Sequence, residues 1–338
     1  MPEYTKPWLS LEKQVGKLHG RGVEIGSYSS ARILLQQVGY YRLTGYLYPF
    51  RESETYLDDS GRERIRVLSD YRSGTSLAYA AQLIDYDRKL RMLVLDAVER
   101  LEVSLRMQIG YTLGHRSAFA HRDPANFVPT FTAGAIDAEA GEPLSGLGRW
   151  LERVQERQCS SDEAFVVHFR ERYDDALPIW ALTEILELGH LGRLFGALQN
   201  DLATTIANAY SVPTKKMFGS WIASVNYVRN VSAHHARLFN RKLVAAPSRP
   251  REGHVPLLDH LRDATGPKAE FGVYNALAVM AFLLGVIDPD CDWNQRLASH
   301  LSDFPAGALT TADMGVPAGW EKQALWHASQ TVRSGAPA

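Results

Sequence analysis

The segment from Trp221 to Arg241 carries an unusual set of polar side chains. Read as a helix, it places amide, imidazole and guanidinium groups three or four residues apart on one face, namely Asn226, Asn230, His234, Arg237 and Arg241. This face contains no acid, whereas solvated helix faces usually mix Glu with Lys. We therefore expect a binding or catalytic site here rather than a solvated surface.

Arg229 and His234 are the pair in this segment best suited to chemistry. RNA carries its own nucleophile, the 2′-hydroxyl group, so a ribonuclease needs no metal if it supplies proton transfer and charge stabilisation. An imidazole titrates near neutrality, and a guanidinium can hold a developing phosphorane through two hydrogen bonds. Asn230 can orient the phosphate or the imidazole. Further positive potential along a substrate path would come from His235, Arg237 and Arg241.

The spacing of Arg229 and His234 is not diagnostic by itself. Two other pairs share the separation of five residues, Arg116 with His121 and Arg249 with His254. The Arg229 pair differs in its setting, with an Asn after the Arg, a second His and an amphipathic helix. Residues five apart on an uninterrupted helix point about 140° apart. We expect either a local distortion of the helix or two protomers that share one cleft.

Residues 1–51 form a locally basic part of a chain whose formal net charge is only −1. The overall charge therefore does not attract the molecule to nucleic acid or membranes. Between Tyr40 and Arg51, aromatic rings alternate with arginines, a composition that suits base stacking and phosphate binding. The candidate RNA-binding residues are Tyr41, Arg42, Tyr46 and Arg51. The alternative is a Tyr-rich seam that packs on the main domain.

The periodicity predicts a mainly α fold. Apolar residues recur every three or four positions over residues 77–113, 148–173, 179–200, 201–210, 214–241 and 271–287, and strand-like alternation is scarce. Ser10 and the serines at 27–30 are expected to cap two earlier helices. We predict an N-terminal unit with its connector at 1–73, the connector being mobile or a short hairpin. A helical domain at 74–290 would follow, with a loop-rich insertion at 114–147 that holds His121 at the surface, and then a loosely attached tail at 291–338.

Several classes of function are disfavoured by the sequence. The two cysteines match neither a zinc nor a redox motif, no paired-carboxylate or histidine cluster suggests a metal, and no glycine-rich phosphate loop is present. We expect no metal and no cofactor. The longest apolar run, residues 274–287, is too short to span a bilayer and reads as a core helix. We expect a cytoplasmic protein without a membrane partner.

Motifs in this order resemble the abortive-infection (Abi) proteins of the AbiD/AbiF-like group, which belong to the HEPN superfamily of helical nucleotide-binding and ribonuclease domains. The matching pieces include GYYRL at 39–43, ERLE at 99–102, PIWALTE at 178–184, NYVRN at 226–230 and RLFNR at 237–241. The resemblance covers residues 6 to about 287. It implies a HEPN-like helical bundle with Arg229, Asn230 and His234 in the catalytic Arg-Asn-x-x-x-His positions, usually completed by dimerisation.

The resemblance implies a metal-independent endoribonuclease of anti-phage defence, a toxin-like effector that is silent until infection. Its expected partners are RNA, a second copy of the chain and a regulatory RNA or protein antitoxin. The alternative function is a non-catalytic RNA-binding or phage-sensing module that uses the same polar stripe. Glu102 could anchor Arg229 or His234, or it could simply form a salt-bridge row on its own helix with Glu99 and Arg106.

Overall fold

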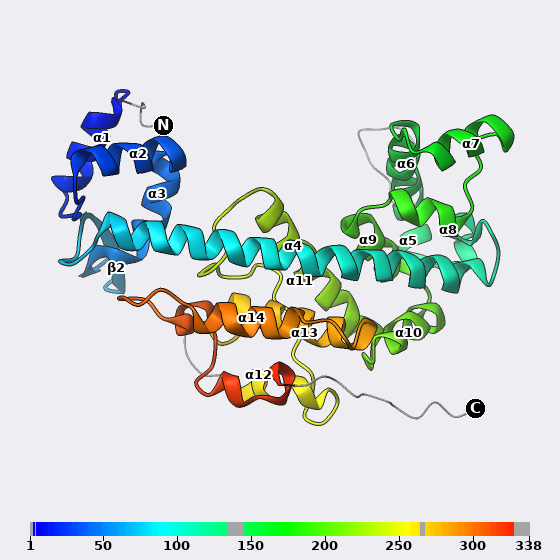
Figure 1. The fold of residues 1–338 in the computed structure, drawn as a ribbon. Coiled ribbons are helices and arrows are strands. Elements are labelled where there is room, and N and C mark those ends of the chain that lie inside the picture. Colours follow the sequence, from blue (N-terminus) through cyan, green and yellow to red (C-terminus); the bar gives the residue numbers. More distant parts are fainter. Residues whose placement is uncertain (1–2, 4, 134–144, 264–267, 328–338) are drawn as a thin grey trace. The chain divides into compact units, whose positions relative to one another are not determined.

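The computed structural model describes residues 3, 5–133, 145–263 and 268–327. These residues form fourteen α-helices, one two-stranded sheet and several short 3₁₀ helices (Figure 1). The predicted mainly α fold is confirmed. Within the described part of the chain, no helix is both long and apolar enough to cross a membrane.

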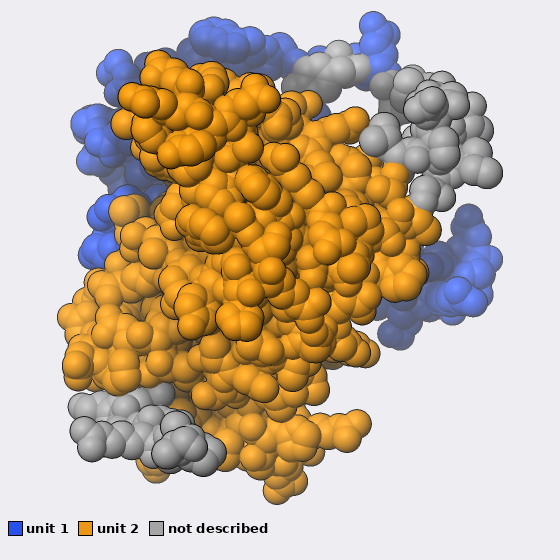
Figure 2. Space-filling view, turned by 90° about the vertical axis from the view of Figure 1, so that its right-hand side faces the viewer, with its two compact units in different colours: residues 1–90, 303–310 blue, residues 91–302, 311–338 orange. Residues whose placement is uncertain are grey.

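The chain divides into two compact units (Figure 2). Unit 1 comprises residues 1–90 and 303–310, and unit 2 comprises residues 91–302 and 311–338. The division falls within the long helix α4 (Leu77–Gly114), which matches the periodic stretch predicted at 77–113. The boundary expected near residue 73 marks instead the turn that leads into this helix.

Unit 1 contains α1 (Leu11–His19), α2 (Tyr28–Val38) and α3 (Tyr40–Leu47), followed by a hairpin of β1 (Arg51–Leu57) and β2 (Glu63–Tyr71). The expected serine caps are present, because Ser10 accepts from Lys13 N and Ser27 accepts from Ser30 N. The strands pair antiparallel with a β-bulge near their base. Of the two alternatives for the connector, the structure therefore shows the hairpin.

Unit 2 is built from helices that surround the buried α13 (Val273–Ile287). In chain order the others are the second part of α4 (residues 91–114), α5 (Pro129–Thr132), α6 (Gly146–Cys159), α7 (Ala164–Arg172), α8 (Ile179–Leu182), α9 (Leu188–Ala197), α10 (Asn200–Ala209), α11 (Lys215–Ala233), α12 (His260–Asp263) and α14 (Trp293–Ser302). Helix α11 packs against α9, α10 and α13 (Figure 1). As predicted, the longest apolar run of the chain forms the central helix.

Within the predicted tail, residues 293–302 and 311–327 are more firmly packed than the sequence predicts. The loosely attached tail was expected from residue 291, but Trp293, Leu297 and Leu301 of α14 are buried. The indole Nε1 of Trp293 donates to the carbonyl of Leu93 at 2.8 Å, and Trp326 Nε1 donates to the hydroxyl of Tyr274 at 3.1 Å. Residues 291–302 and 311–327 therefore contribute to the core of unit 2.

Candidate functional site

Helix α11 positions the central residues of the predicted site. Thr214 caps its N-terminus by accepting from Met217 N at 3.2 Å. Its apolar face is buried, as expected, and includes Phe218, Trp221, Ile222, Val225 and Val228. The opposite side carries Asn226, Arg229 and Asn230, which are all half-buried. The helix thus presents an amide, a guanidinium and a second amide within little more than one turn.

The helix ends earlier than predicted, at Ala233, with His234 as its C-cap. His235 has a φ of 56°, in the left-handed region, and two backbone bonds close the helix end: His235 N to Ser232 O at 3.0 Å and Ala236 N to Val231 O at 2.9 Å. This is a Schellman ending, in which glycine is usual. Both histidines are exposed. His234 therefore lies at the solvent-exposed C-terminus of α11.

Arg237 and Arg241 do not lie on one helical face with Asn226 and Asn230. They follow the turn at His235, and the Nε of Arg241 donates to the carbonyl of Arg237 at 2.8 Å. Leu238 and Phe239, which lie between the two arginines in the sequence, are fully buried and anchor this segment in the core. The predicted five-residue polar stripe is therefore wrong beyond His234, because the backbone changes direction there.

Arg229 is held by its neighbours on both sides. Its Nη1 donates to Asn230 Oδ1 at 3.1 Å and lies 4.0 Å from Glu187 Oε2. Glu187 immediately precedes α9, and its other carboxylate oxygen lies 3.9 Å from Arg157 Nη2 of α6. Sequence reasoning missed Glu187 and Arg157, because nothing local indicates that α6 and α9 approach α11.

Glu102, expected to anchor Arg229 or His234, instead pairs with Arg106 four residues later, at 2.5 Å. The alternative of a salt bridge on its own helix is therefore the one the structure shows for these two residues. Arg106 Nε also donates to the carbonyl of Leu186 at 3.1 Å, while Arg157 Nε donates to the carbonyl of Ile185 at 3.1 Å. Arginines of α4 and α6 thus fix the backbone that leads to Glu187.

His190, in the first turn of α9, is a further histidine and lies near Glu187 and Arg157. Burial lowers the pKa of its imidazole; Glu187 opposes this shift, and the positive charges of Arg157 and Arg153 add to it. Its Nδ1 is buried without a hydrogen-bond partner among the described residues. An imidazole whose pKa is lowered by burial therefore lies on the Glu187 side of the site.

The four candidate RNA-binding residues of unit 1 differ in their exposure and in their contacts. Tyr41 is 81% exposed, whereas Tyr46 is 1% exposed and donates its hydroxyl to Asp87 Oδ2 at 2.5 Å. Arg51 lies over the rings of Tyr48 and Tyr71, at 5.9 and 5.5 Å from the ring centroids. Arg42 is half-buried. Tyr46 therefore cannot stack on a base and belongs to a packing seam, while Tyr41 presents a ring to solvent.

The prediction for the position of His121 is wrong. It was expected at the surface of the loop-rich insertion, but it is 1% exposed, in a short 3₁₀ turn of residues 120–122. Burial, with a smaller contribution from Arg122, lowers the pKa of His121 to about 4. Part of the insertion, residues 134–144, lies outside the described residues. The described part is a folded segment with a buried histidine.

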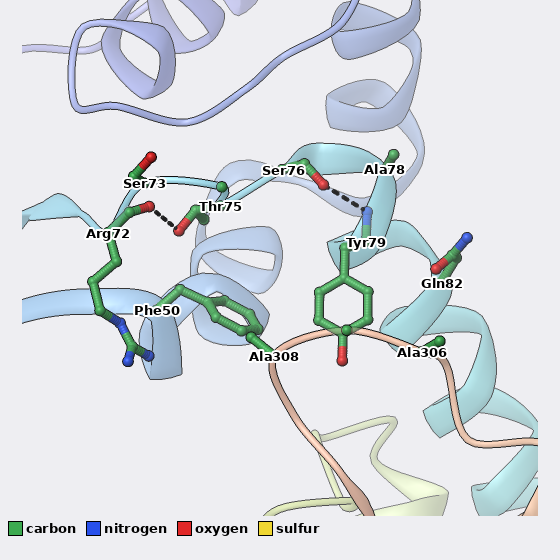
Figure 3. Close-up of a pocket in the computed structure, with 12 residues that line it drawn as sticks. Phe50, Arg72, Ser73, Thr75, Ser76, Ala78, Tyr79, Gln82, Ala306 and Ala308 are labelled. Atoms are coloured by element: carbon green, nitrogen blue, oxygen red, sulfur yellow. Dashed lines mark hydrogen bonds between the residues drawn. The ribbon is translucent and has the colours of Figure 1, made fainter.

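Unit 1 also contains a pocket of about 430 Å³ that no predicted site residue lines (Figure 3). Phe50 and Tyr79 form an aromatic wall, with ring centroids 5.7 Å apart. The Thr75 hydroxyl donates to the carbonyl of Arg72 at 2.6 Å, and Ser76 Oγ accepts from Tyr79 N at 3.2 Å. Because these two hydroxyl groups already form hydrogen bonds within their own loop, the pocket is less suited to ligand binding or catalysis than the site on α11.

Comparison with known protein families supports the resemblance to Abi proteins. A family model described as Abi-like protein matches residues 33–240, more than half of the chain. The matched range includes α11, the histidines at its end, and the Glu102, Arg106 and Glu187 segments. No curated protein and no solved structure gave a significant match.

Proposed function

Because the chain belongs to the Abi-like protein family, we propose that it is a HEPN-type endoribonuclease of abortive infection that needs no metal. Family membership links the chain to abortive-infection defence, and the ribonuclease activity is the further step. The end of α11 carries the proposal: it presents Arg229, oriented by Asn230, and an exposed His234 one turn later. A guanidinium can stabilise developing negative charge and an imidazole can transfer a proton, and metal-free cleavage of RNA uses both kinds of group.

In the proposed reaction His234 removes the proton of a 2′-hydroxyl group, whose oxygen attacks the neighbouring phosphorus. The bond from phosphorus to the 5′-oxygen breaks, and the leaving oxygen takes up a proton. The products end in a 2′,3′-cyclic phosphate and a 5′-hydroxyl group. Arg229 stabilises the additional negative charge on the phosphorane, and Asn230 holds the guanidinium for that purpose.

A homodimer is part of the proposal, because this reaction needs one group that takes a proton and another that gives one. A single chain supplies one His234, and Arg229 and His234 leave α11 in different directions. A second copy would add its own His234 to the cleft. Helix α4 offers a surface for it, since Val103, Met107 and Tyr111 are 49%, 52% and 73% exposed on one face beside the Glu102–Arg106 pair.

The rest of the proposal concerns control and location. A cytoplasmic ribonuclease would have to stay silent until infection, and the exposed Tyr41 with Arg42 offers unit 1 a place to dock a regulatory RNA or protein antitoxin. The alternative function is a non-catalytic RNA-binding or phage-sensing module. The test is to incubate RNA with the purified protein and with its Arg229→Ala variant. Products with cyclic phosphate ends from the wild type alone support catalysis, whereas binding without products supports the alternative.

A further inference from the structure

Two arginines from different helices of unit 2 approach one carboxylate. Nη2 of Arg157 in α6 lies 3.9 Å from Oε1 of Glu187, and Nη1 of Arg229 in α11 lies 4.0 Å from Oε2. Each carboxylate oxygen therefore faces its own guanidinium. The two non-bridging oxygens of a phosphodiester can be received in the same way, because guanidinium groups suit carboxylate and phosphate alike.

Both guanidiniums are also held by contacts that do not involve Glu187. Arg157 donates its Nε to the carbonyl of Ile185 at 3.1 Å, and Arg229 donates to Asn230 Oδ1 at 3.1 Å. The carbonyl of the next residue, Leu186, accepts from Arg106 Nε. The two positive groups would therefore keep their places if another anion replaced the carboxylate of Glu187.

The contacts of Glu187 are weak enough to be replaced. Both lie close to 4 Å, and the side chains of Arg157 and Glu187 are 48% and 45% exposed. Ion pairs at this exposure contribute little, because water screens them and two long side chains must be ordered. An RNA phosphate brings a charge of the same sign to two donors that are already ordered, so it can compete with the carboxylate.

We propose that Arg157 and Arg229 form a phosphate subsite for RNA, which the carboxylate of Glu187 occupies in the free protein. The inference rests on the proposed function, since it assigns the anion to the RNA substrate. It adds Arg157 to the RNA-binding residues. It also makes Glu187 a competitor that an incoming phosphate must displace.

The test is the affinity for a short 2′-O-methyl oligouridine, which offers no 2′-hydroxyl nucleophile and is not cut. Fluorescence anisotropy over a range of salt concentrations should show that Arg157→Gln weakens binding about tenfold and lowers the salt slope by about 0.7. Glu187→Gln should strengthen binding about threefold. The control variants, Arg172→Gln in α7 and Glu156→Gln in α6, change the same charges at exposed positions and should have smaller effects.

The subsite is overturned if Arg157→Gln keeps the wild-type affinity and salt slope, or if Glu187→Gln binds no more tightly than Glu156→Gln. Thermal melting checks the fold, because Arg157 also anchors Ile185. If Arg157→Gln fails to fold, the subsite is judged from the RNA affinity of Glu187→Gln alone. The proposed function fails separately: a wild type that binds the probe but cuts no RNA contradicts catalysis, while a wild type that cuts RNA with an unaffected Arg157→Gln contradicts only the subsite.

Discussion

His234 combines an exposed side chain with a fixed backbone at the end of α11. His234→Ala should reduce cleavage about 10²- to 10⁴-fold, the usual contribution of general acid–base catalysis. The melting temperature should stay within about 2 °C of wild type, because exposed substitutions change stability little. Cleavage assays and thermal melts of the same preparations measure both.

The matched control is His254→Ala. His254 is also exposed and follows Arg249 at the same five-residue distance, but it lies outside α11. Cleavage by this variant should equal that of wild type. Equal losses of activity in both variants would argue against a specific role for His234, and a large fall in the melting temperature of His234→Ala would point to a structural role.

His121 makes stability depend on pH. Its pKa of about 4 in the folded protein lies below the value of about 6.5 expected in the unfolded chain. As pH falls, the unfolded chain therefore binds this proton first. The stability that the neutral imidazole provides is complete above pH 6.5 and is lost as pH falls from 6.5 to 4, amounting to about 2 kcal/mol by pH 5.

Urea unfolding of wild type and His121→Gln at pH 7 and pH 5 tests this dependence. Wild type should lose about 2 kcal/mol more than the variant over this interval, because the amide does not titrate. The variant is the less stable of the two at pH 7. Equal losses in both proteins would show that His121 is not buried in its neutral form.

In unit 1, Tyr41 and Tyr46 of α3 lie in opposite environments, the first exposed and the second buried. Tyr46 donates to Asp87, which is fully buried, so Tyr46→Phe removes a hydrogen bond to a buried carboxylate. The free energy of unfolding in urea should fall by about 1.5 to 3 kcal/mol. RNA affinity should stay unchanged, whereas Tyr41→Ala should weaken it without a loss of stability. Weaker RNA binding by Tyr46→Phe at unchanged stability would contradict the packing role.

Local sequence signals predicted several helices well. Ser10 and Ser27 cap α1 and α2 as expected, and apolar periodicity alone gave bounds for α4 and α13 close to those of the structure. The end of α11 could not be predicted, because a histidine occupies the left-handed position where a glycine would signal the stop. Arg229, Asn230 and His234 were predicted as site residues from their residue types, whereas the contact of Glu187 with Arg229 comes from tertiary packing alone.

At the scale of the whole molecule, the proposed dimer can be tested through α4. Met107→Glu places a charge in the exposed apolar stripe of this helix, which a second copy would have to cover. The variant should sediment as a monomer and lose most of its cleavage activity. Met92→Glu, which changes a comparably exposed methionine 15 positions earlier on α4, is the control and should remain a dimer. Wild-type protein that sediments as a monomer with full activity would refute the shared cleft.

The most direct measurement of the central claim is RNA cleavage in the presence of EDTA, with the product ends identified by mass spectrometry. The α11 site provides a guanidinium and an imidazole, and no group of three or more His, Cys, Asp or Glu residues in the described part of the chain is arranged to hold a metal ion. We expect wild type to cut RNA in chelator and to leave 2′,3′-cyclic phosphate ends, with cleavage by His234→Ala reduced about 10²- to 10⁴-fold. Loss of cleavage in EDTA that magnesium restores, or products with 5′-phosphate ends, would contradict the account.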